Sequence, residues 1–346
     1  MHNEKRYFAS ANTDRGFVSY FDEVFSKLDY VYIIKGGSGT GKSSFIRKLA
    51  DRAELEKMGV EYFYCSSDPL SLDGIIIEDM NIAVIDGTHP HTYDPRMPGI
   101  KDRIINLGDN WNKGILNSRR DEIITLTNKK RDAFNNVYNY LSAVGRINDE
   151  VKYTNQRLVK IEKMQSAVDR LTRGWKPSGC FFRKIRLIES ISHAGHIKYG
   201  TYSTLAENQY IIRDRYGIGG MLLKMIEKTA EHKSIGYYYS PSIFDRNENT
   251  ALFLPSVSSS FVIINEDSFS QKTINMDRFI DVDLYKQNKH KNRFARRCLN
   301  SIFEGVQKGM DEIFELHTAL EQCYINAMDF SKNERLAQEI ISEIFA

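Results

Sequence analysis

The sequence predicts an α/β fold of two tandem units, each with a parallel sheet and an inserted or appended helical hairpin. Short apolar runs alternate with amphipathic helical patterns, an alternation typical of layered α/β sheets. Segments of the first half recur in order in the second half. The chain also has 346 residues, which is more than one average domain needs.

The repeat predicts two copies of one unit of about 170 residues, because four segments match in the same order. The matched segments are 32–35 with 210–213, 62–64 with 237–239, 82–86 with 261–265, and 102–105 with 277–280. Between the copies, a segment with two glycines and a proline reads as a linker. We therefore assign residues 1–172 to the first unit, 173–183 to the linker and 184–346 to the second unit.

The elements of the first unit follow from its periodicity. We expect strands at 30–34, 61–66 and 82–85, an ambiguous run at 75–77, and a helix over 42–56. Residues 116–171 have a charged helical pattern too long for one ordinary helix, which favours an antiparallel hairpin broken at Gly145. The second unit ends in a similar pair of helical patterns, over 292–326 and 333–344.

A glycine-rich segment between the first strand and first helix matches the phosphate-binding pattern G-x-x-x-x-G-K-[ST]. Glycines let successive N–H groups turn toward one anion, and the following helix adds the positive end of its dipole. The residues expected to bind nucleotide are Gly36, Gly37, Ser38, Gly39, Thr40, Gly41, Lys42, Ser43 and Ser44. Lys42 would reach the β- and γ-phosphates, and the Ser43 hydroxyl would bind Mg²⁺. This loop predicts that the two units are P-loop NTPase-like.

An acidic residue at the end of a buried strand is expected to complete the Mg²⁺ site. Asp86, which follows the apolar run 82–85, has this position, so Ser43 and Asp86 are the predicted metal ligands. No glutamate follows Asp86, which argues against the motor and transporter ATPases that use one there. The guanine-reading pattern Asn-Lys-x-Asp is also missing, because 128–131 ends in Arg131. We therefore expect ATP, with GTP less favoured.

Further residues are candidates for work near the γ-phosphate. Asp68 ends the second strand, where it or Asp73 would serve as a base, and Arg96 is a candidate stabiliser of phosphate charge. The predicted catalytic residues are Lys42, Asp86, Asp68 and Arg96. The residues placed to sense the γ-phosphate are Thr88, His89 and His91. The alternative for each of these residues is a purely structural role, as a turn cap or a solvated loop side chain.

The second copy lacks the phosphate site. By the sequence match, Gly220 replaces Lys42, Met221 replaces Ser43, and Asn265 replaces Asp86. Asp214 replaces the first glycine and places a negative charge where a phosphate would lie. Since each charge-assisted contact contributes about 1.5–3 kcal/mol, these losses together predict a structural or regulatory second unit.

Charge, cysteines and hydropathy limit the remaining functions. Ten Lys or Arg and two acids lie in 152–186, and six more bases lie in 286–297. Nucleic acid could bind 152–186, but we favour a solvated helix face, with Trp175, Phe181 and Phe182 packed in the second unit. Four scattered cysteines argue for reduced thiols, and no run is long and apolar enough for a membrane span or export signal. We therefore expect a cytoplasmic protein, with the helical hairpin as a candidate surface for a protein partner.

The motifs of the first unit resemble a family of uncharacterised bacterial tandem P-loop proteins, described as ATPases and common in spore-forming Firmicutes. The matching segments are 7–13, 16–17, 35–43, 65–68, 71–74 and 86–91. In that family the second loop usually keeps a phosphate-binding pattern, whereas this chain does not. The resemblance implies two P-loop domains and ATP as ligand, and it implies no substrate.

These observations predict Mg²⁺-dependent ATP binding with slow hydrolysis at the first loop, coupled as a switch to movement of the hairpin or the second unit. One alternative is a phosphotransferase acting on a small acceptor, with Asp68 or Asp73 as base. The other is a nucleic-acid-dependent ATPase that uses the basic stretch 152–186.

Overall fold

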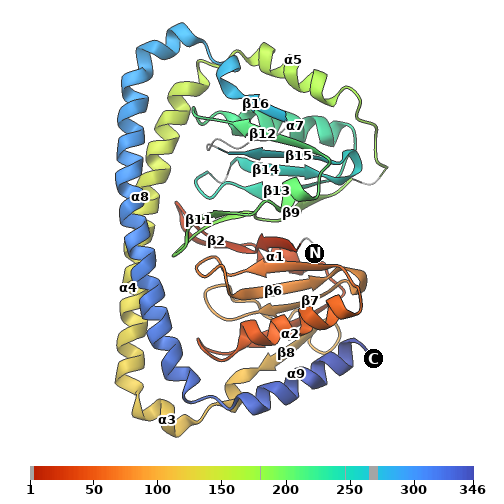
Figure 1. The fold of residues 1–346 in the computed structure, drawn as a ribbon, viewed down its shortest axis with the longest axis vertical. Helices are drawn as coiled ribbons and strands as arrows, with labels where there is room; N and C mark the ends of the chain where they lie inside the picture. Colours follow the sequence, from red (N-terminus) through yellow and green to blue (C-terminus); the bar gives the residue numbers. More distant parts are fainter. Residues whose placement is uncertain (1–3, 180, 246, 265–271) are drawn as a thin grey trace.

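The computed structural model describes residues 4–179, 181–245, 247–264 and 272–346. Two six-stranded sheets lie one beyond the other along the long axis of the molecule, and two long helices run beside both sheets (Figure 1). Cys180 and Asn265, which sequence analysis singled out, lie outside the described residues. The predicted α/β class is confirmed, with one sheet in each half of the chain.

The first sheet is mixed, so the expected parallel sheet is wrong. Its strands are β1 (Lys5–Phe8), β5 (Val60–Tyr64), β6 (Leu72–Ile77), β7 (Ile82–Asp86), β4 (Tyr30–Lys35) and β8 (Asp102–Asn106), in that spatial order. β6 is antiparallel to both of its neighbours, whereas the other pairs are parallel. Only the short η1 turn (Glu78–Met80) and Asn81 separate β6 from β7. Because a parallel connection needs a dozen or more residues, this link requires antiparallel pairing.

The second sheet has the same topology. Its strands are β9 (Arg183–Ile185), β13 (Tyr237–Pro241), β14 (Asn249–Leu254), β15 (Ser259–Ile263), β12 (Asn208–Arg213) and β16 (Lys272–Asn275). The η3 turn (Pro255–Val257) joins β14 to β15, as η1 joins β6 to β7. The repeat is therefore a repeat of structure, with β14 in the role of the antiparallel β6.

The strand ladders correct the register of the sequence match. Asp86 pairs with Ile34, and the equivalent partner of Ile212 is Ile263, two positions before Asn265. The same ladders show that the sequence match of 62–64 with 237–239 is wrong by two residues. The match of 102–105 with 277–280 is wrong by more. A shift of two keeps every side chain on the same face of a strand, so alternating sequences cannot exclude it. Ile263, an apolar residue, thus stands where the first unit has Asp86.

The helix that follows β4, and its equivalent after β12, each cover one face of the sheet. Helix α2 (Lys42–Leu55) follows β4, and α7 (Gly219–His232) follows β12, each with a buried apolar stripe. Six residues separate β4 from α2, but only five separate β12 from α7. The second loop is therefore one residue shorter, and Gly219 and Gly220 take the places of Lys42 and Ser43.

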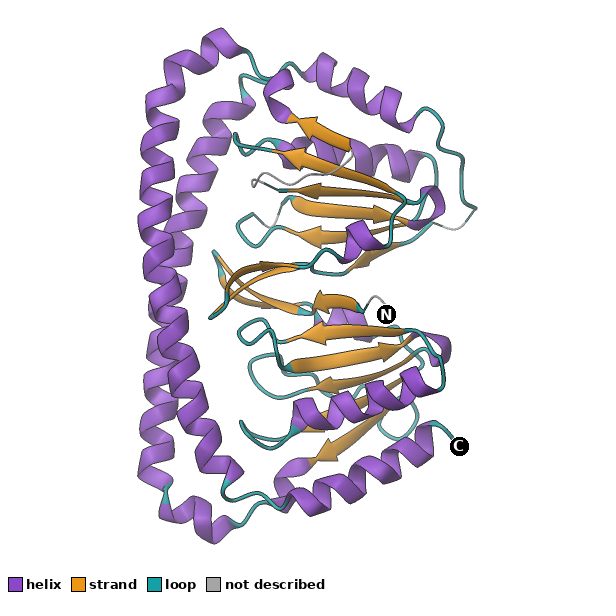
Figure 2. Cartoon of the chain, viewed as in Figure 1, coloured by secondary structure: helices purple, strands orange, loops and turns teal. Residues whose placement is uncertain are grey.

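The expected helical hairpin within each unit is wrong. Helix α4 (Arg120–Gln156) is continuous for 37 residues, about 55 Å, and pairs with α8 (Val282–Ile325) of the second unit. The two run along both sheets (Figures 1 and 2). Gly145 does not break α4. A Cβ atom at Gly145 would lie 2.6 Å from Cβ of Asp14, so this glycine allows the helix to approach the first unit closely.

The last helix of each unit packs on the other unit. Helix α5 (Ile161–Thr172) contacts α7 of the second unit, and the C-terminal α9 (Phe330–Ile344) contacts α2 of the first (Figure 1). Isolated bridges link Val159 to Ile280 and Trp111 to Met328. The two helices therefore cross to the other unit in the same way. Each α/β layer is therefore completed by a helix that comes from the other half of the chain.

The remaining elements are two strand hairpins between the sheets and several short helices. Two small antiparallel hairpins lie here, β2 (Ser10–Thr13) with β3 (Gly16–Ser19), and β10 (Glu189–Ser192) with β11 (Gly195–Lys198). The short helices are α1 (Phe21–Phe25), α3 (Lys113–Ser118), α6 (Thr201–Thr204), η2 (Leu107–Asn110) and η4 (Met276–Phe279). A buried ion pair joins the halves, with Arg186 Nη2 2.7 Å from Glu61 Oε2. Among the described residues no helix combines the length and apolarity needed to cross a membrane.

Candidate functional site

The glycine-rich loop turns at two glycines with positive φ angles. Gly39 has φ +67° and Gly41 has φ +83°, values that favour glycine. The Thr40 hydroxyl donates to the carbonyl of Gly37 at 2.9 Å and closes the loop on itself. Helix α2 begins at Lys42, directly after Gly41. The loop therefore ends at a helix N-terminus, where N–H groups and the helix dipole favour an anion.

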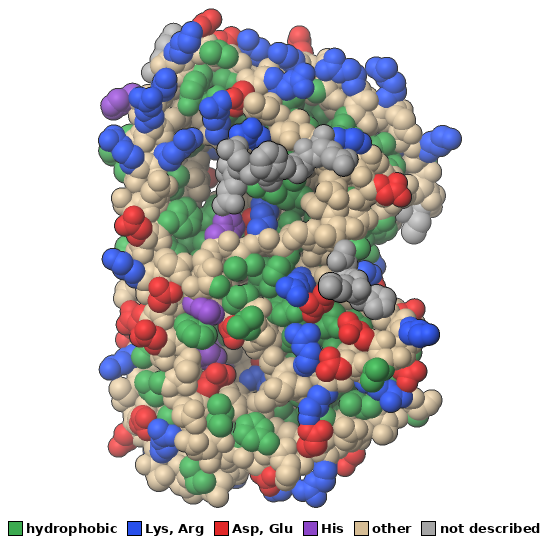
Figure 3. Space-filling view, viewed as in Figure 1, with side chains coloured by type: hydrophobic (Ala, Val, Ile, Leu, Met, Phe, Trp, Pro, Cys, Tyr) green, Lys and Arg blue, Asp and Glu red, His purple; other side chains and the backbone are tan. Residues whose placement is uncertain are grey.

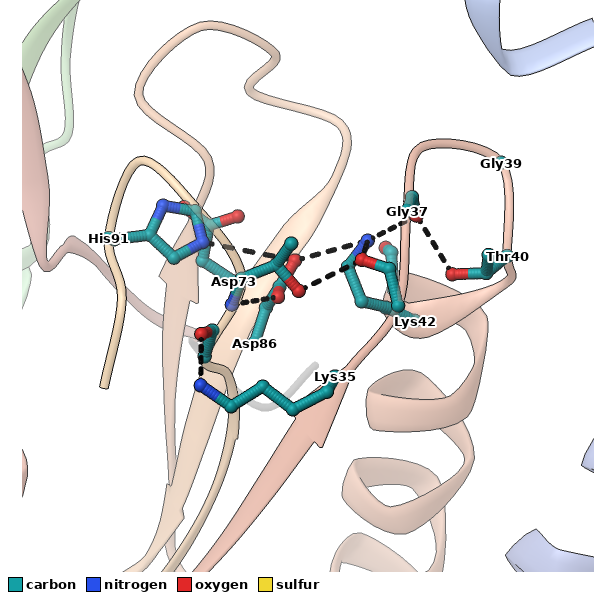
Figure 4. Close-up of polar contacts among 12 residues, drawn as sticks. Lys35, Gly37, Gly39, Thr40, Lys42, Asp73, Asp86 and His91 are labelled. Carbon is teal, nitrogen blue, oxygen red and sulfur yellow. Dashed lines mark hydrogen bonds and ion pairs between the residues drawn. The ribbon is translucent and has the colours of Figure 1, made fainter. Parts of the chain in front are cut away.

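The ammonium group of Lys42 lies between the loop and the end of strand β7. It donates to the carbonyl of Gly37 at 2.6 Å and of Gly36 at 3.3 Å, and it lies 3.5 Å from Oδ2 of Asp86 (Figure 4). Strands β4 and β7 are adjacent and parallel, which brings their carboxyl ends to the same edge. The structure thus brings together two residues that sequence analysis assigned separately.

The hydroxyl groups near this edge have defined partners. The Ser43 oxygen accepts a hydrogen bond from the backbone N–H of Leu72 at 2.9 Å and keeps a second lone pair. The Thr88 hydroxyl donates to the carbonyl of Gly36 at 3.0 Å, and its N–H donates to Asp86 Oδ1 at 2.9 Å. Thr88 therefore links the end of β7 to the glycine-rich loop.

Asp73 and His91 lie on the other side of Asp86 from Lys42 (Figure 4). His91 Nε2 is 3.8 Å from Asp86 Oδ2, and His91 Nδ1 is 4.0 Å from Asp73 Oδ2. All three side chains are buried. Burial raises the pKa of Asp73 to about 6. For Asp86, burial is outweighed by His91 and by the charge of Lys42, which lower the pKa to about 2.

Two predicted residues lie elsewhere. The guanidinium of Arg96 is half exposed and donates to Asp22 at 2.8 Å, on helix α1. The carboxylate of Asp68 accepts from the N–H of Leu70 at 3.1 Å and lies 3.7 Å from Nε2 of His193, in the β10–β11 turn. His89 and Ser44 are exposed. Asp68 therefore faces the second unit, while Arg96 is held by an ion pair on the first.

The second unit covers the outer side of the loop. A Cβ atom at Gly39 would lie 2.6 Å from the carbonyl oxygen of Glu321 in α8, so only glycine fits this contact. The Asn333 amide, in α9, donates to the carbonyl of Thr40 at 2.9 Å. The ring of Tyr324 lies beside Gly37. Helices α8 and α9 of the second unit thus hold the glycine-rich loop in place.

One carboxylate of the second unit contacts the glycine-rich loop. Glu321 Oε1 accepts a hydrogen bond from the N–H of Gly39 at 3.3 Å. Burial raises the pKa of Glu321, against the effect of this hydrogen bond. His317, one turn earlier, lies 3.3 Å from Nζ of Lys130 in α4, and burial lowers the pKa of His317 to about 4. Sequence analysis missed these residues, since Gly39 and Glu321 are 282 positions apart and no local pattern connects them.

The second loop already contains an anion of its own. The Asp214 carboxylate accepts from the N–H groups of Tyr216 and Ile218 at 3.1 Å each, and of Gly219 at 2.6 Å. Asp214 is 7% exposed. The carboxylate therefore occupies the N–H groups that a phosphate would need, as the sequence led us to expect.

No family model, curated protein or solved structure matches the chain. The resemblance to tandem P-loop proteins therefore stays a prediction that depends on the motifs themselves. Function has to be argued from the geometry of the first loop.

Proposed function

We propose that the first unit binds Mg²⁺-ATP and hydrolyses it slowly, as a switch that acts on helix α8. One observation carries the proposal, namely the loop of residues 36–43 with Lys42 beside Asp86 at the adjacent strand end. The positive φ angles at Gly39 and Gly41 and the start of α2 suit a polyphosphate. Mg²⁺, bound by Ser43 and Asp86, would neutralise charge on the β- and γ-phosphates.

The hydrogen bond from Gly39 to Glu321 supports this choice of ligand class. It places a carboxylate oxygen on an N–H group of the loop, so this part of the loop binds an anionic group. A nucleotide phosphate would compete for the same N–H and repel the carboxylate. Since Glu321 belongs to a helix that runs along both sheets, its displacement would transmit binding to the second unit.

Replacing Glu321 with glutamine is therefore expected to tighten Mg²⁺-ATP binding about 10-fold, at the low end for a charged hydrogen bond because the contact is long. Glutamine keeps the size and the acceptor oxygen but removes the negative charge. Isothermal titration calorimetry measures the effect, with Glu315→Gln, on an exposed position of the same helix, as control. Unchanged affinity would contradict the competition, and lost turnover at unchanged affinity would assign Glu321 to water activation instead.

Two alternatives predict different measurements. A phosphotransferase would transfer the γ-phosphate to a small acceptor, with the carboxylate of Asp68, beside His193, or that of Asp73 as base. A nucleic-acid-dependent ATPase would release phosphate faster with single-stranded DNA or RNA. Helix α5 and the start of α8 do lie at one end of the molecule, where Lys and Arg side chains gather (Figures 1 and 3), whereas β9 lies near the middle. However, Trp175 packs against Phe261 and the ring of Phe182 against Tyr238, so these aromatic rings already have protein partners.

A further inference from the structure

We propose that Asp73, Asp86 and His91 bind a divalent first-row transition-metal ion, with Mn²⁺ as the representative, in addition to any Mg²⁺ that a nucleotide brings. One ligand atom from each residue lies within 4.8 Å of the others. The three side chains come from β6, the end of β7 and the loop that follows β7, and they point toward one another in Figure 4.

Among the residues that the structure describes, two of these polar atoms have no hydrogen-bond partner. Asp73 Oδ2 and His91 Nε2 are inaccessible to solvent and have no hydrogen bond, although Asp73 is only 4% exposed and His91 only 7%. Buried polar atoms are nearly always paired, so two such atoms within one cluster of three side chains indicate a missing partner. The distances of 3.8 and 4.0 Å to the carboxylates are too long for direct hydrogen bonds. They start from different ring nitrogens, and an ion would bind only one of these together with the carboxylate oxygens that lie within 4.8 Å of it.

The ligand types select the class of metal. Mg²⁺ and Ca²⁺ prefer oxygen ligands, whereas an imidazole nitrogen suits first-row transition metals. Phe21, buried in α1, stacks on the His91 ring at 4.7 Å and fixes its plane. Lys42 contacts Asp86 from the opposite side, so it leaves the side facing Asp73 and His91 to the metal. The ladders place Thr250 and Ile263 where the first unit has Asp73 and Asp86, so the second unit lacks this pair of ligands.

The test uses the full-length protein and Mn²⁺ alone, without nucleotide. Binding removes the six-line electron paramagnetic resonance signal of free Mn²⁺, so a titration gives the affinity directly. We expect His91→Ala and Asp73→Asn each to weaken binding by at least about 10-fold, the lower range for disturbed metal sites. His232→Ala, which removes an exposed histidine from α7 of the second unit, should leave the affinity unchanged. Circular dichroism shows whether each variant is folded, and His91→Gln provides a second, less disruptive removal of the ligand.

Several outcomes would overturn the proposal. If wild-type protein binds no Mn²⁺ in the absence of nucleotide, the three residues are an imidazolium between two carboxylates. If Mn²⁺ binds and His91→Ala or His91→Gln retains full affinity while folded, the ion lies elsewhere. Nucleotide affinity is measured separately with Lys42 variants, so failure of the metal site and failure of ATP binding are distinguishable.

Discussion

Replacing Lys42 with alanine is expected to lower the affinity for Mg²⁺-ATP by about 100-fold or more. The ammonium group lies against the loop carbonyls and beside Asp86. It would turn to the β- and γ-phosphates with a small movement, because its present partners line the same loop. Two charge-assisted contacts of about 1.5–3 kcal/mol each account for a loss of this size. Isothermal titration calorimetry with Mg²⁺ and ATP measures it.

The matched control removes a lysine from the equivalent helix of the second unit. Lys224→Ala in α7 makes the same chemical change on an exposed position, and we expect wild-type affinity. Gly220→Ala is a poor control, since its Cβ would collide with the side chain of Glu248. If the wild type gives no heat with Mg²⁺-ATP, or if Lys42→Ala binds as tightly, the proposed function fails. Equal loss in Lys224→Ala would indicate a second nucleotide site.

Replacing Asp214 with alanine is expected to reduce the free energy of unfolding by about 3 kcal/mol or more. Three backbone N–H groups donate to this buried carboxylate, and an unsatisfied buried donor costs about 1–3 kcal/mol. Water entering the loop would recover part of the loss. Urea unfolding followed by circular dichroism measures the change, provided that the slope of the transition stays constant.

Two comparisons make this second result specific. Asp132→Ala removes an exposed aspartate from α4 and should change stability by less than about 0.5 kcal/mol. Asp214→Ala should also gain no nucleotide binding, because Gly219, Gly220 and Ile263 stand where the first unit has Lys42, Ser43 and Asp86. A loss below about 1 kcal/mol would show that the loop keeps its shape without the carboxylate.

Local patterns were enough to predict the loop and its two neighbours. The strand before Gly36 and the helix from Lys42 have almost the predicted bounds, because glycine spacing and apolar periodicity act within a few residues. The antiparallel β6 was missed since only 75–77 was read from it, and its connection to β7 is short. The repeat was found, but its register was shifted by two in strands whose alternation tolerates that shift.

The partners of the long helices could not be read from the sequence. Helices α5 and α9 each have an apolar stripe. Such a stripe shows that the helix packs against another element, but it does not show which element. Docking on the helix of the same unit and docking on the other unit satisfy the same pattern. For the same reason, the contacts of Glu321 and Asn333 with the loop could not be predicted, because both residues lie near the far end of the chain.

The reciprocal placement of α5 and α9 has a consequence for the history of such a chain. A polypeptide with one unit could make these contacts only by pairing with an identical copy, as in a domain-swapped homodimer. Joining the copies covalently makes the partner permanent and removes the requirement that both be the same. One half can then lose its lysine and its metal ligand while it still supplies the helix that completes its neighbour. After such a fusion, the two halves no longer need the same sequence and can take different roles.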